Sequence, residues 1–110
     1  MPSMSGLTII VAGSDPARFH ASLEIAASNA ALGRRTRLFL QSGAVSLLQP
    51  QADGRLDLLG EAIALGASVT ACQSGLALAG MSAEQLPEGV DTGGLVELLA
   101  TRGDDQLLMA

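Results

Sequence analysis

Lysine is absent from this sequence of 110 residues, and its six basic residues are all arginine. A P-loop lysine, a Schiff-base lysine and a catalytic serine–lysine pair are therefore excluded. Tryptophan and tyrosine are also absent, and only two phenylalanines occur. These absences remove the stacking platforms that single-stranded nucleic-acid binders use. A net charge of -5 also disfavours contact with phosphate backbones, so no nucleic-acid partner is expected.

A single cysteine, Cys72, cannot form an internal disulfide. The N-terminus shows no charged region followed by an apolar run and a cleavage site, so we expect a protein of the reducing cytoplasm. The longest apolar runs fall well short of the roughly 18 residues that span a bilayer, and no membrane span is expected. One histidine and one cysteine cannot supply a four-ligand zinc site. Neither a metal nor another cofactor is therefore predicted.

The apolar residues make up 48% of the chain, and they are mainly leucine, alanine, valine and isoleucine. An aliphatic core of this kind needs no disulfide or metal to support it. The length fits one domain, because two domains would each be left with too small a core. We therefore expect a single domain over residues 1–110.

Apolar and β-branched runs alternate with helical patterns along the chain. Asp15 and Pro16 are typical of a helix start, and that helix is expected to end near Gly33. Asp91 or Thr92 is predicted to cap a last helix. The predicted strands are Leu7–Ala12, Thr36–Leu40, Ala67–Ala71 and Gln106–Met109. Short helical turns are predicted at Ala44–Leu48, after Cys72 and at Ser82–Gln85. A longer helix is predicted through Leu56, Leu59 and Ile63.

Alternation of this kind predicts a three-layer α/β sandwich. Its sheet should be mainly parallel, with about four to five strands and helices on both faces. Ile25 lies opposite the apolar stripe of the first long helix, so some apolar surface is left over. Burial against another copy of the chain is the expected use of that surface.

Three polar loops are expected to meet at one edge of this sheet, because ligands of open parallel sheets bind outside the carboxyl ends of the strands. The first loop contains Ser14, the second contains Ser42 and Gly43, and the third follows Cys72. The candidate ligand-binding residues in these loops are Ser14, Ser42, Gly43, Gln73, Ser74 and Gly75. This edge is the predicted functional site.

Cys72 is the candidate catalytic residue. At a strand-to-helix boundary its sulfur can face the amide groups of Ser74, Gly75 and Leu76, which would stabilise a thiolate. The alternative is that Cys72 is a small buried hydrophobic residue, the commoner fate of a lone cysteine. A phosphatase loop is excluded because position 78, six residues further on, is leucine. The G-x-S-x-G elbow and the Walker A pattern are also absent.

His20 is a further candidate, as a proton donor or acceptor near Cys72. Its alternative is an exposed position in which it pairs with Glu24, four residues further along the helix. Arg34, Arg35 and Arg37 follow the end of the same helix, where cations interact well with the helix dipole. We expect these arginines to be solvated and structural.

Three stretches of the chain resemble the DsrE/DsrF-like family, which includes the Tus sulfur-relay subunits. They are Ile9–Leu32, with its G-S-D-P loop and Phe19-His20-Ala21; Arg37–Val45, ending in L-Q-S-G-A-V; and Gly66–Val90, with G-A-S-V-T-A-C and L-P-E-G-V. The likeness spans nearly the whole chain as a diffuse pattern of small and apolar residues. It implies the fold more strongly than it implies an activity.

This resemblance implies that Cys72 forms a persulfide, because sulfur-relay members place a cysteine after the third strand. It also implies a homo-oligomer, a trimer or a hexamer. Sulfur donors and acceptors would be other proteins or small thiols, since the chain has no second cysteine. A sulfur carrier or sulfurtransferase is therefore the first hypothesis for function. A non-catalytic oligomeric module that binds a ligand or protein, and a thiol redox sensor, are the alternatives.

Overall fold

A computed structural model describes residues 6–50 and 53–110. Its single five-stranded sheet is parallel throughout, with the strand order β4-β3-β2-β1-β5. The strands are β1 (Leu7–Val11), β2 (Thr36–Leu40), β3 (Ser68–Cys72), β4 (Val90–Gly93) and β5 (Gln106–Met109). The helices are α1 (Pro16–Ala31), η1 (Ser42–Leu48), α2 (Arg55–Ala64), α3 (Gln73–Ala79), η2 (Ala83–Gln85) and α4 (Leu95–Ala100). The predicted α/β class with a parallel sheet is confirmed.

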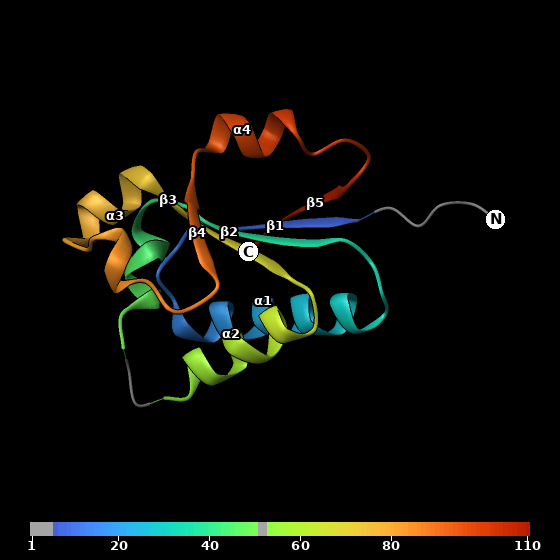
Figure 1. Ribbon diagram of the computed structural model, residues 1–110, viewed down its shortest axis with the longest axis horizontal. Helices are drawn as coiled ribbons and strands as arrows, with labels where there is room; N and C mark the ends of the chain where they lie inside the picture. The colour runs from blue at the N-terminus through green and yellow to red at the C-terminus, as the bar shows by residue number, and fades with distance from the viewer. Residues whose placement is uncertain (1–5, 51–52) are drawn as a thin grey trace.

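Helices cover both faces of the sheet. Figure 1 shows α1 and α2 side by side below it and α4 alone above it. The short helices α3 and η1 pack together at the end of the sheet where β2 and β3 finish. The arrangement has three layers, and it gathers the connections that follow β2 and β3 at one end.

The first long helix begins as its sequence predicts. The Asp15 side chain accepts a hydrogen bond of 3.0 Å from the amide of Ala17, and Pro16 is the first helical residue. Phe19, Leu23 and Ala26 recur on one face of α1 and are fully buried. They pack against the aliphatic side chains of β1, β2 and β3, which form the main core. Ile25 faces away and is 43% exposed, as the helical pattern indicates.

The prediction for residues 90–93 is wrong. Asp91 and Thr92 do not cap a helix but lie inside β4, which pairs with β3 in parallel, and α4 begins only after Gly94. The strand is short, lies at the sheet edge and has a polar middle, so its sequence carries almost no strand signal. Hydrogen bonds to β3 hold these residues extended.

Arg37 is not solvated, which corrects the prediction for this arginine. Its side chain is 15% exposed and its Nε lies 3.6 Å from the carboxylate of Asp105. It also donates hydrogen bonds to the hydroxyls of Thr8 and Thr101 and to the carbonyl of Leu98. Thr8 is fully buried and donates to Asp105 at 3.1 Å. This buried polar network links α4 and the residue before β5 to β1 and β2.

Candidate active site

Cys72 is the last residue of β3 and also the residue that immediately precedes α3. Its backbone is extended, with φ -64° and ψ 128°, and the chain turns into the helix at Gln73. Side chains alternate along a strand, so Cys72 lies on the same face as Thr70, which is the face covered by α4. The fold therefore places the sulfur at the carboxyl edge of the sheet, where the loops after β2 and β3 meet.

A cavity of about 290 Å³ opens beside Cys72. Its walls come from the loop after β2, the start of α3 and the β4–α4 connection. None of the residues that line it is charged: they are Gln41, Ser42, Cys72, Gln73, Ser74, Gly93, Gly94 and Leu95. Cys72 itself is only 9% exposed and also belongs to the hydrophobic core. Cys72 therefore packs into the hydrophobic core on one side and lines the cavity on the other.

Two opposing effects act on the pKa of the Cys72 thiol. Burial is the largest single effect, and it raises the pKa. Backbone amides of Gly75, Ser42 and Ser74, together with the Ser74 hydroxyl, donate hydrogen bonds to the sulfur and lower the pKa. The hydrogen bonds outweigh burial in sum, so the pKa of the thiol lies below its ordinary value of 9.0. Neutral dipoles alone favour the thiolate here, since no cation lines the cavity.

Ser42 supplies one of these amides through an unusual backbone conformation. Its φ is +52°, the only positive value at a non-glycine residue in the described part of the chain. Serine rarely adopts this left-handed conformation, which costs roughly 1 kcal/mol or more. The turn brings the start of η1 against α3. The Ser42 amide then reaches the sulfur of Cys72, which lies in the next strand-to-helix connection along the chain.

Gly75 makes this close approach possible. A Cβ atom at position 75 would lie 2.5 Å from the Ser42 carbonyl oxygen and 2.5 Å from Cγ2 of Val45. Only a residue without a side chain lets α3 pack so tightly against η1. The same packing aims the Gly75 amide at Cys72.

The predicted ligand-binding residues divide into two groups. Ser42, Gln73 and Ser74 line the cavity, whereas Gly75 is outside its lining and packs against Ser42. Ser14 and Gly43 are exposed and do not line the cavity. His20 is also outside its lining; its Nε2 lies 3.4 Å from Glu24 on the exposed side of α1. The sequence-based alternative for His20, a pair with Glu24, is the arrangement that the structure contains.

The set of amide donors differs from the predicted one in one member. Ser74 and Gly75 donate as expected, but the third amide belongs to Ser42 and not to Leu76. Sequence reasoning considered only the helix that follows the cysteine. Residues that it missed are Gly93, Gly94 and Leu95, which reach the cavity from the end of β4 and the start of α4, whereas Gln41 belongs to the predicted loop after β2. Correct placement of β4 would have found the two glycines.

No family model matches this chain, and no curated protein is similar to it in sequence. Several solved structures are similar to this chain in fold. The YchN protein from E. coli superposes with a TM-score of 0.77 at 22% identity, covering 97% of this chain and 100% of that one. A protein of unknown function from Methanobacterium thermoautotrophicum, MTH1491, superposes with a TM-score of 0.81 at 18% identity, over the same shares.

The chain has a YchN-like fold. This result agrees with the DsrE-type architecture that the sequence resemblance implies. At these identities the likeness concerns the fold alone and assigns no reaction. None of the helices in the described part of the chain combines the length and apolar character that a membrane span requires.

The reactivity of Cys72 should follow pH in a defined way. Because the thiolate is the nucleophile and the pKa is lowered, the rate of alkylation should reach half its maximum at a pH below that of a free cysteine. Removing the hydroxyl in Ser74→Ala should move that midpoint to higher pH. Iodoacetamide labelling across a pH series, followed by mass spectrometry, measures both midpoints. A midpoint at or above that of a free cysteine, measured under the same conditions, would contradict the role given to the amides.

Proposed function

We propose that this protein is a sulfur carrier or sulfurtransferase that holds sulfane sulfur as a persulfide on Cys72. The observation that carries the proposal is the position of Cys72, which ends a parallel strand at the carboxyl edge of the sheet and lines a cavity, with neighbouring amides that lower the pKa of its thiol. These donors favour an anionic sulfur, which is the form both of the attacking thiolate and of a persulfide. The sequence resemblance to sulfur-relay proteins supports the same reaction.

The transfer proceeds in two balanced steps. The Cys72 thiolate attacks the sulfane sulfur of a donor, a new S–S bond forms on Cys72, and the bond between that sulfur and the donor breaks. The donor leaves with the bonding electron pair, shortened by one sulfur atom. An external thiolate then attacks the outer sulfur of the persulfide and releases Cys72 as thiolate. The acceptor must be another molecule, because the chain holds no second cysteine.

Sulfur loading can be measured directly. The reduced protein is incubated with polysulfide, with thiosulfate and with an organic persulfide, and is then analysed by intact-mass and peptide mass spectrometry. We expect the mass of one added sulfur atom on the peptide that contains Cys72, reversed by a reducing thiol. Cys72→Ser should show no such addition. Failure of all three donors to load the unaltered protein would defeat the proposal.

The low exposure of Cys72 favours a second candidate, a non-catalytic binding module in which this thiol is inert. The two candidates differ in how fast the native thiol reacts. An inert thiol is alkylated slowly in the folded state and at the rate of a free cysteine only after unfolding. The carrier reacts in the folded state at neutral pH, because its thiolate is favoured and faces a cavity.

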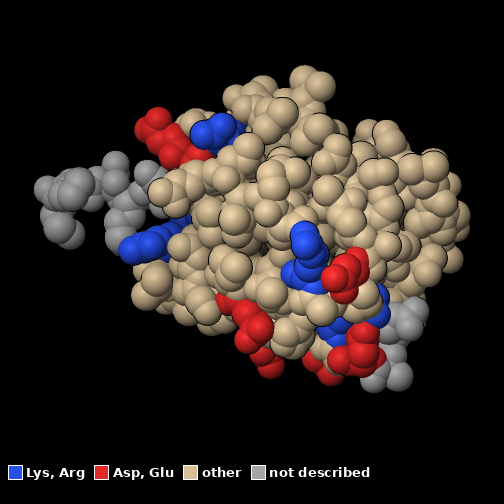
Figure 2. Space-filling view, turned by 180° about the vertical axis from the view of Figure 1, so that it is seen from behind, with Lys and Arg blue, Asp and Glu red and all other residues tan. Residues whose placement is uncertain are grey.

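We also propose that the chain works as a homo-oligomer, a trimer or a hexamer, in the cytoplasm. Large aliphatic side chains remain exposed on α1, α3, α4 and β5, among them Ile25, Leu78, Val96 and Met109. Figure 2 shows that much of one face of the molecule carries no charged side chain. Burial against further copies would remove this surface from water. A monomeric mass in native mass spectrometry at micromolar concentration would contradict the oligomer.

A further inference from the structure

A second cavity, of about 400 Å³, lies between α4 and the part of the sheet formed by β2, β3 and β4. Phe39, Thr70 and Asp91 occupy neighbouring register positions across these strands and form its floor. Glu97 and Thr101 line it from α4 and the end of that helix. The sheet face is open here because α4 has only six residues and covers only part of the sheet.

We call this second cavity the groove. The groove and the Cys72 cavity share two lining residues, Gly93 and Gly94. Gly93 is the register partner of Cys72 on the neighbouring strand, so no side chain stands beside the sulfur on that flank. A Cβ atom at Gly93 would lie 3.0 Å from Cγ2 of Thr70, at the boundary between the two spaces. The groove and the cavity therefore adjoin at two residues that have no side chain.

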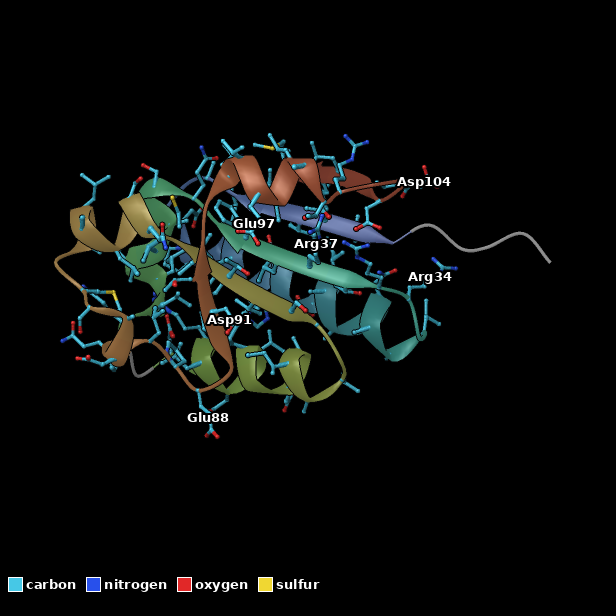
Figure 3. All side chains as sticks on the ribbon, turned by 45° about the horizontal axis from the view of Figure 1, so that its top comes forward. Arg34, Arg37, Glu88, Asp91, Glu97 and Asp104 are labelled. Atoms are coloured by element: carbon cyan, nitrogen blue, oxygen red, sulfur yellow. The ribbon has the colours of Figure 1, made fainter. Side chains whose placement is uncertain are left out.

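The groove carries unbalanced negative charge. Asp91, on its floor, and Glu97, on α4, are exposed carboxylates, and none of the ion pairs found among the described residues involves either of them. Arg37, which Figure 3 labels together with these two residues, also lines the groove but is more buried, with a side chain that is 15% exposed. Its guanidinium lies beside Asp105, a carboxylate that it shares with Arg35, and it donates hydrogen bonds to Thr8, Thr101 and Leu98. It therefore has little capacity left to bind an anion.

We propose that Asp91 and Glu97 make Cys72 selective for sulfur compounds that carry a positive charge close to the reacting sulfur, such as aminothiols and their disulfides or persulfides. The ammonium group of the ligand occupies the groove while its sulfur reaches Cys72 past Gly93 and Gly94. Anionic sulfur compounds meet two carboxylates and no free cation. This inference rests on the reactive Cys72 of the proposed function, but it does not require sulfur loading.

Thiol–disulfide exchange tests the selectivity with three reagents that differ mainly in charge: cystamine, bis(2-hydroxyethyl) disulfide and 3,3′-dithiodipropionate. The Cys72 thiolate attacks one sulfur, a new S–S bond to Cys72 forms, and the reagent's own S–S bond breaks. The other half leaves as a thiolate that takes a proton from water. Mass spectrometry of the mixed disulfide gives the rate for each reagent.

Each rate for the unaltered protein is divided by the rate for the double variant Asp91→Asn, Glu97→Gln, which cancels the intrinsic reactivity of the reagent. We expect a ratio of roughly ten for cystamine, near one for the neutral reagent and below one for the anionic one, since local charge commonly changes association rates by about tenfold or more. The neutral reagent reports any change in the thiolate fraction of Cys72. High salt should bring all three ratios together.

The matched control is Glu61→Gln with Asp104→Asn, which removes the same two charges at exposed positions outside the groove. The rate of the unaltered protein divided by the rate of this control should stay near one for all three reagents. Equal ratios for the three reagents, or the same pattern in the control, would overturn the inference. If charge selectivity is present but no donor loads sulfur, the carrier proposal fails and the selectivity stands. If a donor loads sulfur but the three ratios are equal, only the selectivity proposal fails.

Discussion

Gly75→Ala is expected to destabilise the fold by about 1–3 kcal/mol and to raise the pKa of the Cys72 thiol. The added methyl group would lie 2.5 Å from both the Ser42 carbonyl oxygen and Val45 Cγ2, so α3 and η1 must move apart. That movement takes the amides of Ser42 and Gly75 away from the sulfur. Urea unfolding measures the first effect, and the ultraviolet absorbance of the thiolate across a pH series measures the second.

Gly60→Ala provides the matched control. Gly60 lies within α2, and a Cβ atom there would meet nothing within 4 Å. Alanine is the better helix former, so this variant should gain up to about 1 kcal/mol in the free energy of unfolding. The pKa of Cys72 should be the same as in the unaltered protein. If Gly75→Ala were as stable as the unaltered protein and kept its thiol pKa, the close contact between η1 and α3 would not be what holds the donors.

Asp105→Ala is expected to cost about 3–5 kcal/mol in the free energy of unfolding, because removing one partner of a buried ion pair leaves the other uncompensated. Asp105 is 5% exposed and interacts with Arg37 and Arg35, and it accepts a hydrogen bond from Thr8. Burial has already lowered the pKa of Arg37, and the loss of Asp105 removes the interaction that raises it. Urea unfolding monitored by circular dichroism measures the cost.

Asp104→Ala is the control for this prediction, since the neighbouring carboxylate is exposed and forms none of the ion pairs found among the described residues. Its effect should stay within about 0.5 kcal/mol. Asp105→Asn keeps the shape of the side chain and removes the charge. Its free energy of unfolding should therefore fall between those of the two alanine variants. Equal stability of Asp104→Ala and Asp105→Ala would show that the network contributes nothing to the fold.

The site itself was predictable only in part. Cys72 and the residues that follow it were found from sequence, because a cysteine between a β-branched run and a small-residue helix indicates the carboxyl end of a strand. Ser42 was predicted as a ligand-binding residue at the same edge of the sheet, but not as an amide donor to the sulfur. Its left-handed backbone and its contact with Gly75 arise from the packing of η1 against α3. No local pattern encodes that contact.

Arg37 shows the same limit in another place. Three arginines near a helix end indicate a solvated basic cluster when read along the chain. In the fold, strand alternation points Arg37 toward α4 and toward Asp105, which lies 68 positions later in the sequence. A pairing over that distance depends on β5 joining β1. The sequence offers a carboxylate and a guanidinium but does not indicate that they meet.

The amino-acid sequence alone determined the α/β class, the buried strands β1, β2 and β3, the start of α1 and the single cysteine on which chemistry could centre. These features depend on local periodicity and capping, which act over a few residues. Tertiary structure decided the edge strand β4, the buried pairing of Arg37 with Asp105 and the ring of amides around Cys72. Each of these joins groups that are remote along the chain, and their geometry exists only once the sheet has assembled.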